Sequence, residues 1–351
     1  MIRLRHPVSL VLALALSSCT RSAPKVDQVS HRLVVDTVAS ADDGVFFRPA
    51  DMVMLPSAQL AVLEYTPSSI IVIDPSTGAL VRRIGEPGKG PGQLLTPLGL
   101  QLVGDTLVTL NVGNGRIERF LSEGKSLGSS PAPDGIALGR FVLNPDGGIL
   151  APTAGAEGTL LRVLTPSGAV AHTIGQPVVG FNREYDLGAF RQLAAQSKVL
   201  PYYANDVLAA MTADSLFWLA FASVPELALY ERDGKRRAVV RLPDSAAAPI
   251  LDEYRRRNQE ESQTPRFHPL LYFADVRVVG NMAWALLKSP PDVDARVLVA
   301  DSSGRVVADL VFAGAKDVWR IAPDLSRGKI YLSSASASEI YSATLPKALV
   351  R

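Results

Sequence analysis

Residues 69–84 read SIIVIDPSTGALVRRI, an apolar run, a Pro-Ser-Thr-Gly turn and a second strand-forming run. This pattern is typical of two short antiparallel strands joined by a tight turn, in which Gly78 supplies the positive φ. The unit recurs as GRIERFLSEGK (115–125), TLLRVLTPSGAVAHTI (159–174), ELALYERDGKRRAVVRL (226–242) and ARVLVADSSGRVVADLV (295–311). A weaker copy without the turn glycine lies at residues 339–349. The chain is therefore a series of repeated strand units.

A second strand pair precedes these units, and it reads most clearly at residues 51–64, 275–288 and 317–333. Two pairs make a four-stranded repeat. The turn glycines that mark the repeat are Gly78, Gly124, Gly168, Gly234 and Gly304. The first two intervals lie near the roughly 40–45 residues of a propeller blade, and the last two are longer and require insertions. The pattern predicts an all-β, six-bladed β-propeller of four-stranded antiparallel blades, because closing the ring removes exposed sheet edges.

Residues 31–38 (HRLVVDTV) form an additional strand near the N-terminus. The last repeat is one strand short, so we expect this N-terminal strand to complete the sixth blade and close the ring. The long intervals fall between blades three and four, at residues 182–205, and between blades four and five, at residues 244–273. Each insertion is predicted to contain a short helix. In the second, Asp252 and Glu253 precede Arg256 and Arg257 at a spacing that favours ion pairs.

Residues 1–19 have the features of a bacterial lipoprotein signal peptide. Arg3 and Arg5 precede an apolar stretch that is too short to cross a bilayer, and Leu-Ser-Ser-Cys at residues 16–19 resembles a lipobox. Cys19 is the only cysteine, so it is the predicted lipidation site, although an ordinary signal peptide with an incidental cysteine is an alternative. Residues 20–30 would then be a tether and residues 31–351 the propeller. By the sorting rule of bacterial lipoproteins, Thr20 predicts the outer membrane of a Gram-negative host, facing the periplasm.

The charge of the mature chain excludes one class of partner. The net charge of +2 comes from 36 basic and 34 acidic residues, and the signal peptide contains two of the basic ones. The mature protein is thus neutral, whereas nucleic-acid binding usually requires a concentrated basic surface. We expect a monomeric ring that contacts the membrane only through its lipid.

Both insertions should lie over the same rim of the central channel, because the connections between blades share a face with the loops between second and third strands. Aspartates at the starts of inner strands, including Asp51, Asp206, Asp275 and Asp317, should surround that mouth and could attract a cation. Alternatively, they accept backbone N–H bonds. The predicted binding residues at the mouth are Arg48, Asp51, Tyr65, Asn111, Arg116, Asp206, Asp275 and Lys288. Those in the insertions are Tyr202, Tyr203, Arg266 and His268, unless these only pack the insertions against the ring.

Residues 85–120 (GEPGKGPGQLLTPLGLQLVGDTLVTLNVGNGRIERF) resemble an NHL repeat. The matching positions are Gly88, Gly90, Pro91, Gly92, Gln93, Leu94, Pro97, Gly99, Asn111, Asn114, Arg116, Ile117 and Phe120. The rest of the mature chain resembles the six-bladed propeller lipoproteins of bacteria in period and turn chemistry. NHL propellers chiefly bind other macromolecules, so the resemblance implies a binding module. The glycine-rich loop is not a phosphate cradle, because no helix is expected after it.

Two functions are compatible with these features. The first is a binding platform for a protein, peptide or glycan of the cell envelope, without turnover and without a cofactor. The alternative is a calcium-dependent lactonase or hydrolase, for which Glu64, Asn111 and Asp206 are the best candidate ligands. A zinc site is not expected, because His31, His172 and His268 lack metal-ligand spacing. With no nucleophile motif visible, the sequence favours binding over catalysis.

Overall fold

The computed structural model describes residues 30–45, 48–132, 142–143, 147–334 and 336–350. The predicted signal peptide and Cys19 lie outside these ranges. Sheet 1 contains β2 (Pro49–Met54), β3 (Leu60–Glu64), β4 (Ser69–Ile73) and β5 (Leu80–Ile84). Sheet 2 contains β8 (Pro97–Val103), β9 (Thr106–Asn111), β10 (Arg116–Leu121) and β11 (Ser126–Pro131). Each is a four-stranded antiparallel meander, as the strand–turn–strand pattern predicts.

Two further sheets repeat this arrangement. Sheet 3 contains β12 (Val142–Leu143), β13 (Ile149–Pro152), β14 (Leu161–Leu164) and β15 (Val170–Ile174). Sheet 4 contains β16 (Val207–Met211), β17 (Phe217–Phe221), β18 (Glu226–Tyr230) and β19 (Arg236–Arg241). The middle strands β17 and β4 are buried along their whole length, because both of their faces pack against neighbouring sheets. Their continuous apolar runs reflect that environment.

The remaining strands form one eight-stranded sheet, here sheet 5, in the order β20-β21-β22-β23-β1-β26-β25-β24. Its strands are β20 (Phe273–Val279), β21 (Met282–Leu287), β22 (Asp294–Ala300), β23 (Val306–Lys316), β24 (Val318–Asp324), β25 (Lys329–Ser334), β26 (Glu339–Thr344) and β1 (Ser30–Ser40). Two separate four-stranded sheets were expected in this part of the chain. They are joined because β1 pairs with both, in parallel with β23 and antiparallel with β26. The predicted pairing of the N-terminal strand with the last strand is observed, whereas the pairing with β23 was not foreseen.

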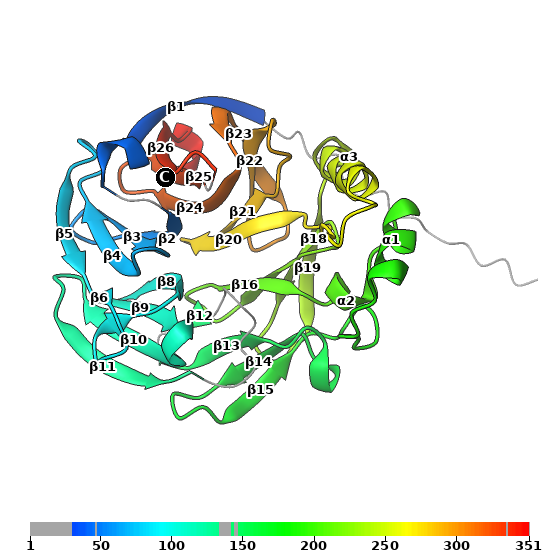
Figure 1. Ribbon diagram of the computed structural model, residues 1–351, viewed down its shortest axis with the longest axis horizontal. Helices are drawn as coiled ribbons and strands as arrows, with labels where there is room; N and C mark the ends of the chain where they lie inside the picture. The colour runs from blue at the N-terminus through cyan, green and yellow to red at the C-terminus, as the bar shows by residue number, and fades with distance from the viewer. Residues whose placement is uncertain (1–29, 46–47, 133–141, 144–146, 335, 351) are drawn as a thin grey trace, which may run out of the picture.

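The sheets lie side by side around a centre, and their first strands, β2, β8, β12, β16, β20 and β24, face it (Figure 1). These six strands line a central cavity of about 370 Å³. Apolar side chains fill the space between adjacent sheets, with Trp218 and Trp284 fully buried. The radial arrangement places the first residues of each inner strand at one rim of the cavity.

The helices lie together at one side of the ring (Figure 1). The first insertion contains α1 (Leu187–Ala195) and α2 (Pro201–Ala204), and the second contains α3 (Asp244–Glu260), so both predicted helical insertions are observed. Short 3-10 turns are at Ala41–Asp43, Val112–Asn114, Ala156–Gly158 and Lys347–Leu349, and β6 (Glu86–Pro87) pairs with β7 (Gln93–Leu94) inside the glycine-rich loop. None of the described helices has the length and apolar character that a membrane span requires.

The insertions and the glycine turns lie at opposite ends of the sheets. In sheet 4, for example, the Asp233-Gly234 turn connects β18 to β19, and α3 follows the other end of β19. The end that carries the insertions is called the insertion face below. The side chains of α3 that point toward the ring are Ala246, Ile250, Tyr254 and Asn258, which recur every fourth residue and form one buried stripe.

Candidate functional site

A cluster of four charged side chains lies at the centre of the ring and is called the central charge cluster. A guanidinium nitrogen of Arg277 contacts Asp51, and its Nε donates to Asp275 Oδ2 at 3.1 Å. Arg320 Nε lies 3.8 Å from Asp51 Oδ1. Burial opposes the charge of Arg277, but the carboxylates of Asp275 and Asp51 outweigh this effect and raise its pKa above the usual value. Two carboxylates and two guanidinium groups thus neutralise each other.

The two aspartates also bind backbone groups of the next first strand. Asp51 Oδ2 accepts the N–H of Leu100 at 2.8 Å, and Asp275 Oδ2 accepts the N–H of Ile321 at 3.1 Å. Of the two interpretations drawn from the sequence, the backbone-acceptor role is the one observed for these residues, with donors in a neighbouring strand instead of a turn. The cations next to these two carboxylates are arginine side chains of the protein itself. Asp275 is fully buried and Asp51 nearly so.

Asn111 and Arg116 hold the glycine-rich loop. Asn111 Oδ1 accepts the N–H of Leu95 at 2.7 Å, and its Nδ2 donates to the carbonyl of Gln93 at 2.8 Å. Arg116 Nη2 donates to the carbonyls of Lys89 at 3.0 Å and Gly90 at 3.1 Å. Asn111 and Arg116, two of the residues that carry the NHL resemblance, therefore have a structural role in this loop, and their predicted binding role stays a prediction.

Asp206, Tyr202 and Tyr203 take part in packing the insertions. Arg183 Nη2 donates to Asp206 Oδ1 at 2.6 Å, and its guanidinium carbon lies 5.0 Å from the centre of the Tyr202 ring. Burial raises the pKa of Asp206, and the bond from Arg183 partly opposes this rise. The rings of Tyr202 and Tyr203 are 4.7 Å apart, and Tyr203 stacks 6.3 Å from Phe267, which follows α3. The contacts of Tyr202 and Tyr203 agree with the packing alternative, and the predicted binding roles of these two residues and of Asp206 stay predictions.

Arg48 and Tyr65 form a pair on the insertion face of sheet 1. The guanidinium carbon of Arg48 lies 5.1 Å from the centre of the Tyr65 ring. The N–H of Arg48 donates to Glu64 Oε2 at 3.3 Å, and Glu64 is fully buried. All three candidate calcium ligands, Glu64, Asn111 and Asp206, already bind other groups of the protein. Within the described ranges, no group of three or more His, Cys, Asp or Glu side chains is placed to hold a metal ion.

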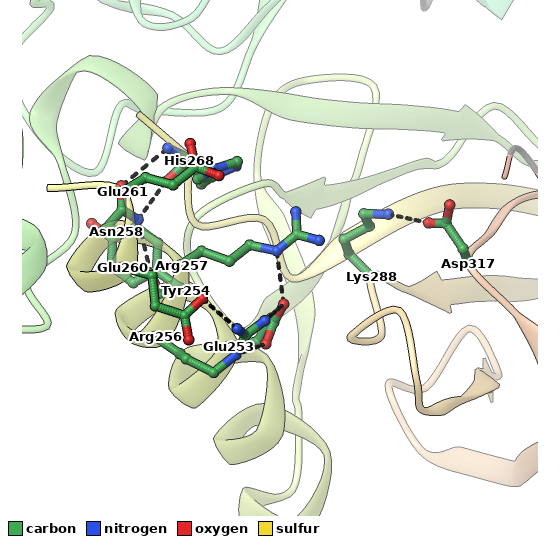
Figure 2. A network of polar contacts seen from close by, with 10 residues as sticks. All are labelled: Glu253, Tyr254, Arg256, Arg257, Asn258, Glu260, Glu261, His268, Lys288 and Asp317. Atoms are coloured by element: carbon green, nitrogen blue, oxygen red, sulfur yellow. Dashed lines mark hydrogen bonds and ion pairs between the residues drawn. The ribbon is translucent and has the colours of Figure 1, made fainter. Parts of the chain in front are cut away.

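A second cavity, of about 330 Å³, opens between α3 and sheet 5 on the insertion face. It is called the α3 cleft. One wall is α3, with Glu253, Tyr254 and Arg257, and the other is formed by Lys288 after β21 and Trp319 in β24. Figure 2 shows Arg257 extending from α3 toward Lys288, which contacts Asp317 on the far side. Three segments that are distant in the sequence thus meet in this cleft.

Lys288, Asp317 and Trp319 form a compact unit in the α3 cleft. Lys288 Nζ lies 3.1 Å from Asp317 Oδ1 and 3.8 Å from the centre of the Trp319 ring. Trp319 Nε1 donates to the same oxygen of Asp317 at 2.9 Å. Burial lowers the pKa of Lys288 below its usual value, and Asp317 opposes that effect. Asp317 has a φ of +46°, a backbone strain of a kind that concentrates at functional sites.

His268 also lines the α3 cleft, so the structure brings together two predicted binding residues, Lys288 and His268. His268 Nε2 lies 3.1 Å from Glu261 Oε1, and the backbone N–H of His268 donates to Asn258 Oδ1 at 3.0 Å. Arg266 lies two residues earlier and is exposed outside the cleft. Trp319 was missed because a single tryptophan in a strand pattern gives no signal of exposure. Arg257 was noticed only as an ion-pair partner within its helix.

Comparisons with known proteins bear on the fold. No protein-family model matches the chain, and no curated protein matches its sequence. Among solved structures, streptogramin B lyase aligns over 90% of this chain and 98% of its own, with 9% identity and a TM-score of 0.51. The Xanthomonas campestris gluconolactonase XC5397 aligns over 89% of each chain, with 11% identity and a TM-score of 0.51. These proteins are β-propellers. The chain has a β-propeller fold.

A third similar structure comes from Bacteroides fragilis and is described as an exported protein. This propeller aligns over 91% of our chain and 99% of its own, with 10% identity and a TM-score of 0.50. At such identities the likeness extends to the fold and not to the activity of these proteins, because one fold serves many functions. The function of this propeller must be argued from its own site.

Proposed function

We propose that this propeller is an exported binding module that captures a ligand of the cell envelope on its insertion face, without turnover. The observation that carries the proposal is the α3 cleft. It combines an aromatic side chain that is 38% exposed, Trp319, with a cation, Lys288, that is only 22% exposed. Ligand sites are usually concave and mostly apolar, with a few polar groups that fix orientation. The α3 cleft fits this description, whereas the charges of the central charge cluster already satisfy one another.

The number of blades, export, lipid anchoring and the class of ligand are part of the same proposal. Sheet 5 would count as two blades that share β1, which gives six blades in all. The apolar segment within residues 1–19 supports export, and the similar structure described as an exported protein agrees with it. Lipidation of Cys19 would place the ring at the outer membrane, with residues 20–30 as its tether. The ligand would be a protein, peptide or glycan that reaches the insertion face.

Site-specific photo-crosslinking in cells tests the binding function. A photoreactive residue at Pro291, which is exposed at the edge of the α3 cleft, should form adducts with an envelope component. The same residue at Lys235, exposed in the turn at the opposite end of sheet 4, is the matched control. Trp319→Ala should remove the adducts formed from Pro291. Equal adducts from both positions, or none from Pro291, would contradict the proposal.

A further inference from the structure

The walls of the α3 cleft contain two cations with unused hydrogen-bond donors. Arg257 Nε donates to Glu253 at 2.7 Å, and its Nη groups contact no acceptor in the part of the chain that the structure describes. Lys288 has three N–H donors, of which one meets Asp317. The guanidinium of Arg257 points toward Lys288 (Figure 2). Like charges that face one another across a partly buried space favour an anion between them.

The neighbouring carboxylates restrict the charge of that anion. Glu253 and Asp317 also line the cleft, so the two cations are largely balanced before any ligand enters. Both carboxylates repel any anion, and they repel a dianion such as hydrogen phosphate more strongly than a monoanion. A carboxylate has one charge, and its planar shape fits the fork of a guanidinium group. The electrostatics of the cleft therefore favour a monocarboxylate.

The remaining walls are apolar and aromatic. Ile250, Leu271 and Pro290 line the cleft together with Trp319. Tyr254 also belongs to the lining, although it is only 4% exposed. The cleft thus offers a mainly apolar surface to the body of a ligand.

We propose that the α3 cleft binds a small monocarboxylate with an apolar or aromatic body, held at its charged end by Arg257 and Lys288 and covered by Trp319. The inference rests on the proposed binding function and names the chemistry of its ligand. A free organic acid and the C-terminus of a peptide both present this chemistry. The volume of about 330 Å³ is at the small end of ligand pockets, which suits either source.

Tryptophan fluorescence of the purified full chain can report binding directly. The chain has three tryptophans, of which Trp218 and Trp284 are fully buried and Trp319 is exposed at the cleft. Phenylacetate should give a saturable change in emission that Trp319→Phe removes. Inorganic phosphate is the control anion and should give none. A tetrapeptide ending in phenylalanine, with a free or an amidated C-terminus, distinguishes a peptide from a free acid as the natural source.

Substitutions of the two cations test the geometry. Lys288→Met and Arg257→Gln should each weaken carboxylate affinity about tenfold or more, since each removes a charged hydrogen bond. Arg255→Gln is the matched control, because Arg255 lies on the same helix, is similarly exposed and bonds to Asp252 outside the cleft. Circular dichroism would confirm that all three variants are folded. Unchanged affinity in both cleft variants would overturn the proposal.

The outcomes separate this inference from the binding function. If neither phenylacetate nor the free peptide changes the emission, the carboxylate proposal is wrong. Crosslinking from Pro291 in cells would then still show whether the insertion face binds another kind of ligand. Phosphate affinity equal to that of phenylacetate would also overturn the proposal, because it would mean that the site does not select a monocarboxylate. Selective binding of the free peptide or of the small acid would support it and identify the source.

Discussion

Substituting Arg277 by methionine should destabilise the ring more than any change to a surface ion pair. Arg277 contacts Asp51 and Asp275, whose exposed fractions are 5% and 0%. Removing one partner from a buried ion pair costs about 3–5 kcal/mol, because the remaining charge is left uncompensated. Both aspartates keep a backbone N–H donor, and Asp51 also has Arg320 nearby. We therefore expect a loss near the lower limit, about 3 kcal/mol of unfolding free energy.

Urea unfolding followed by tryptophan fluorescence measures this loss, since Trp218 and Trp284 are fully buried in the folded state. Arg305→Met is the matched control. Arg305 also pairs with an aspartate, Asp301, at 3.0 Å, but its side chain is 64% exposed. Exposed pairs contribute about 0–1 kcal/mol. If Arg277→Met costs no more than Arg305→Met, the central charge cluster does not hold the first strands together, and the reasoning fails.

Four other measurements test the structure and its proposed use. Gly78→Ala would place a Cβ atom 2.2 Å from the carbonyl oxygen of Val38 in β1, so urea unfolding should show a larger loss of unfolding free energy than for Gly168→Ala. Gly168 also has a positive φ, but no atom lies within 4 Å of its Cβ position. Its substitution by alanine should therefore cost only about 1–2 kcal/mol. Cys19→Ala should move the full chain from the membrane fraction to the soluble fraction. Calcium added after chelation should leave the melting temperature unchanged, and a rise would favour the lactonase alternative. Carboxylate affinity should fall as pH rises, because binding needs protonated Lys288. Since burial lowers the pKa of Lys288, this fall should begin below the pKa of an ordinary lysine. Lys288→Met should remove the pH dependence.

The repeat and the insertions could be predicted because they depend on local sequence. The turn glycines have positive φ, for example +72° at Gly78 and +85° at Gly234. Glu253 pairs with Arg257 four residues later, as the helical spacing predicts, and also with Arg256. Such features follow from the backbone requirements of turns and from the geometry of a helix. They do not depend on how the sheets are arranged around the ring.

The partners of the predicted site residues could not be foreseen in the same way. The contact between Arg277 and Asp51 joins residues 226 positions apart, and the parallel pairing of β1 with β23 joins opposite ends of the chain. Neither leaves a pattern in a local window. Of the four aspartates singled out at inner strands, Asp51 and Asp275 meet at the centre through Arg277, whereas the other two pair elsewhere. The partners of Asp51 and Asp275 were missed because arginines are frequent and no spacing marks the two that reach them.

The position of the α3 cleft follows from how a closed repeat handles charge. At the centre of a ring, side chains from several inner strands share a small space, so a charge buried there needs an opposite charge close by. Asp51 and Asp275 are balanced in this way by Arg277, and a ligand would have to replace a bond that already exists. An insertion has no equivalent in the other repeats, so no matching residues of those repeats are placed to pair with its charges. Arg257 on α3 faces Lys288 of sheet 5 without a carboxylate that belongs to both. Ligand chemistry is therefore expected where the repeat is interrupted.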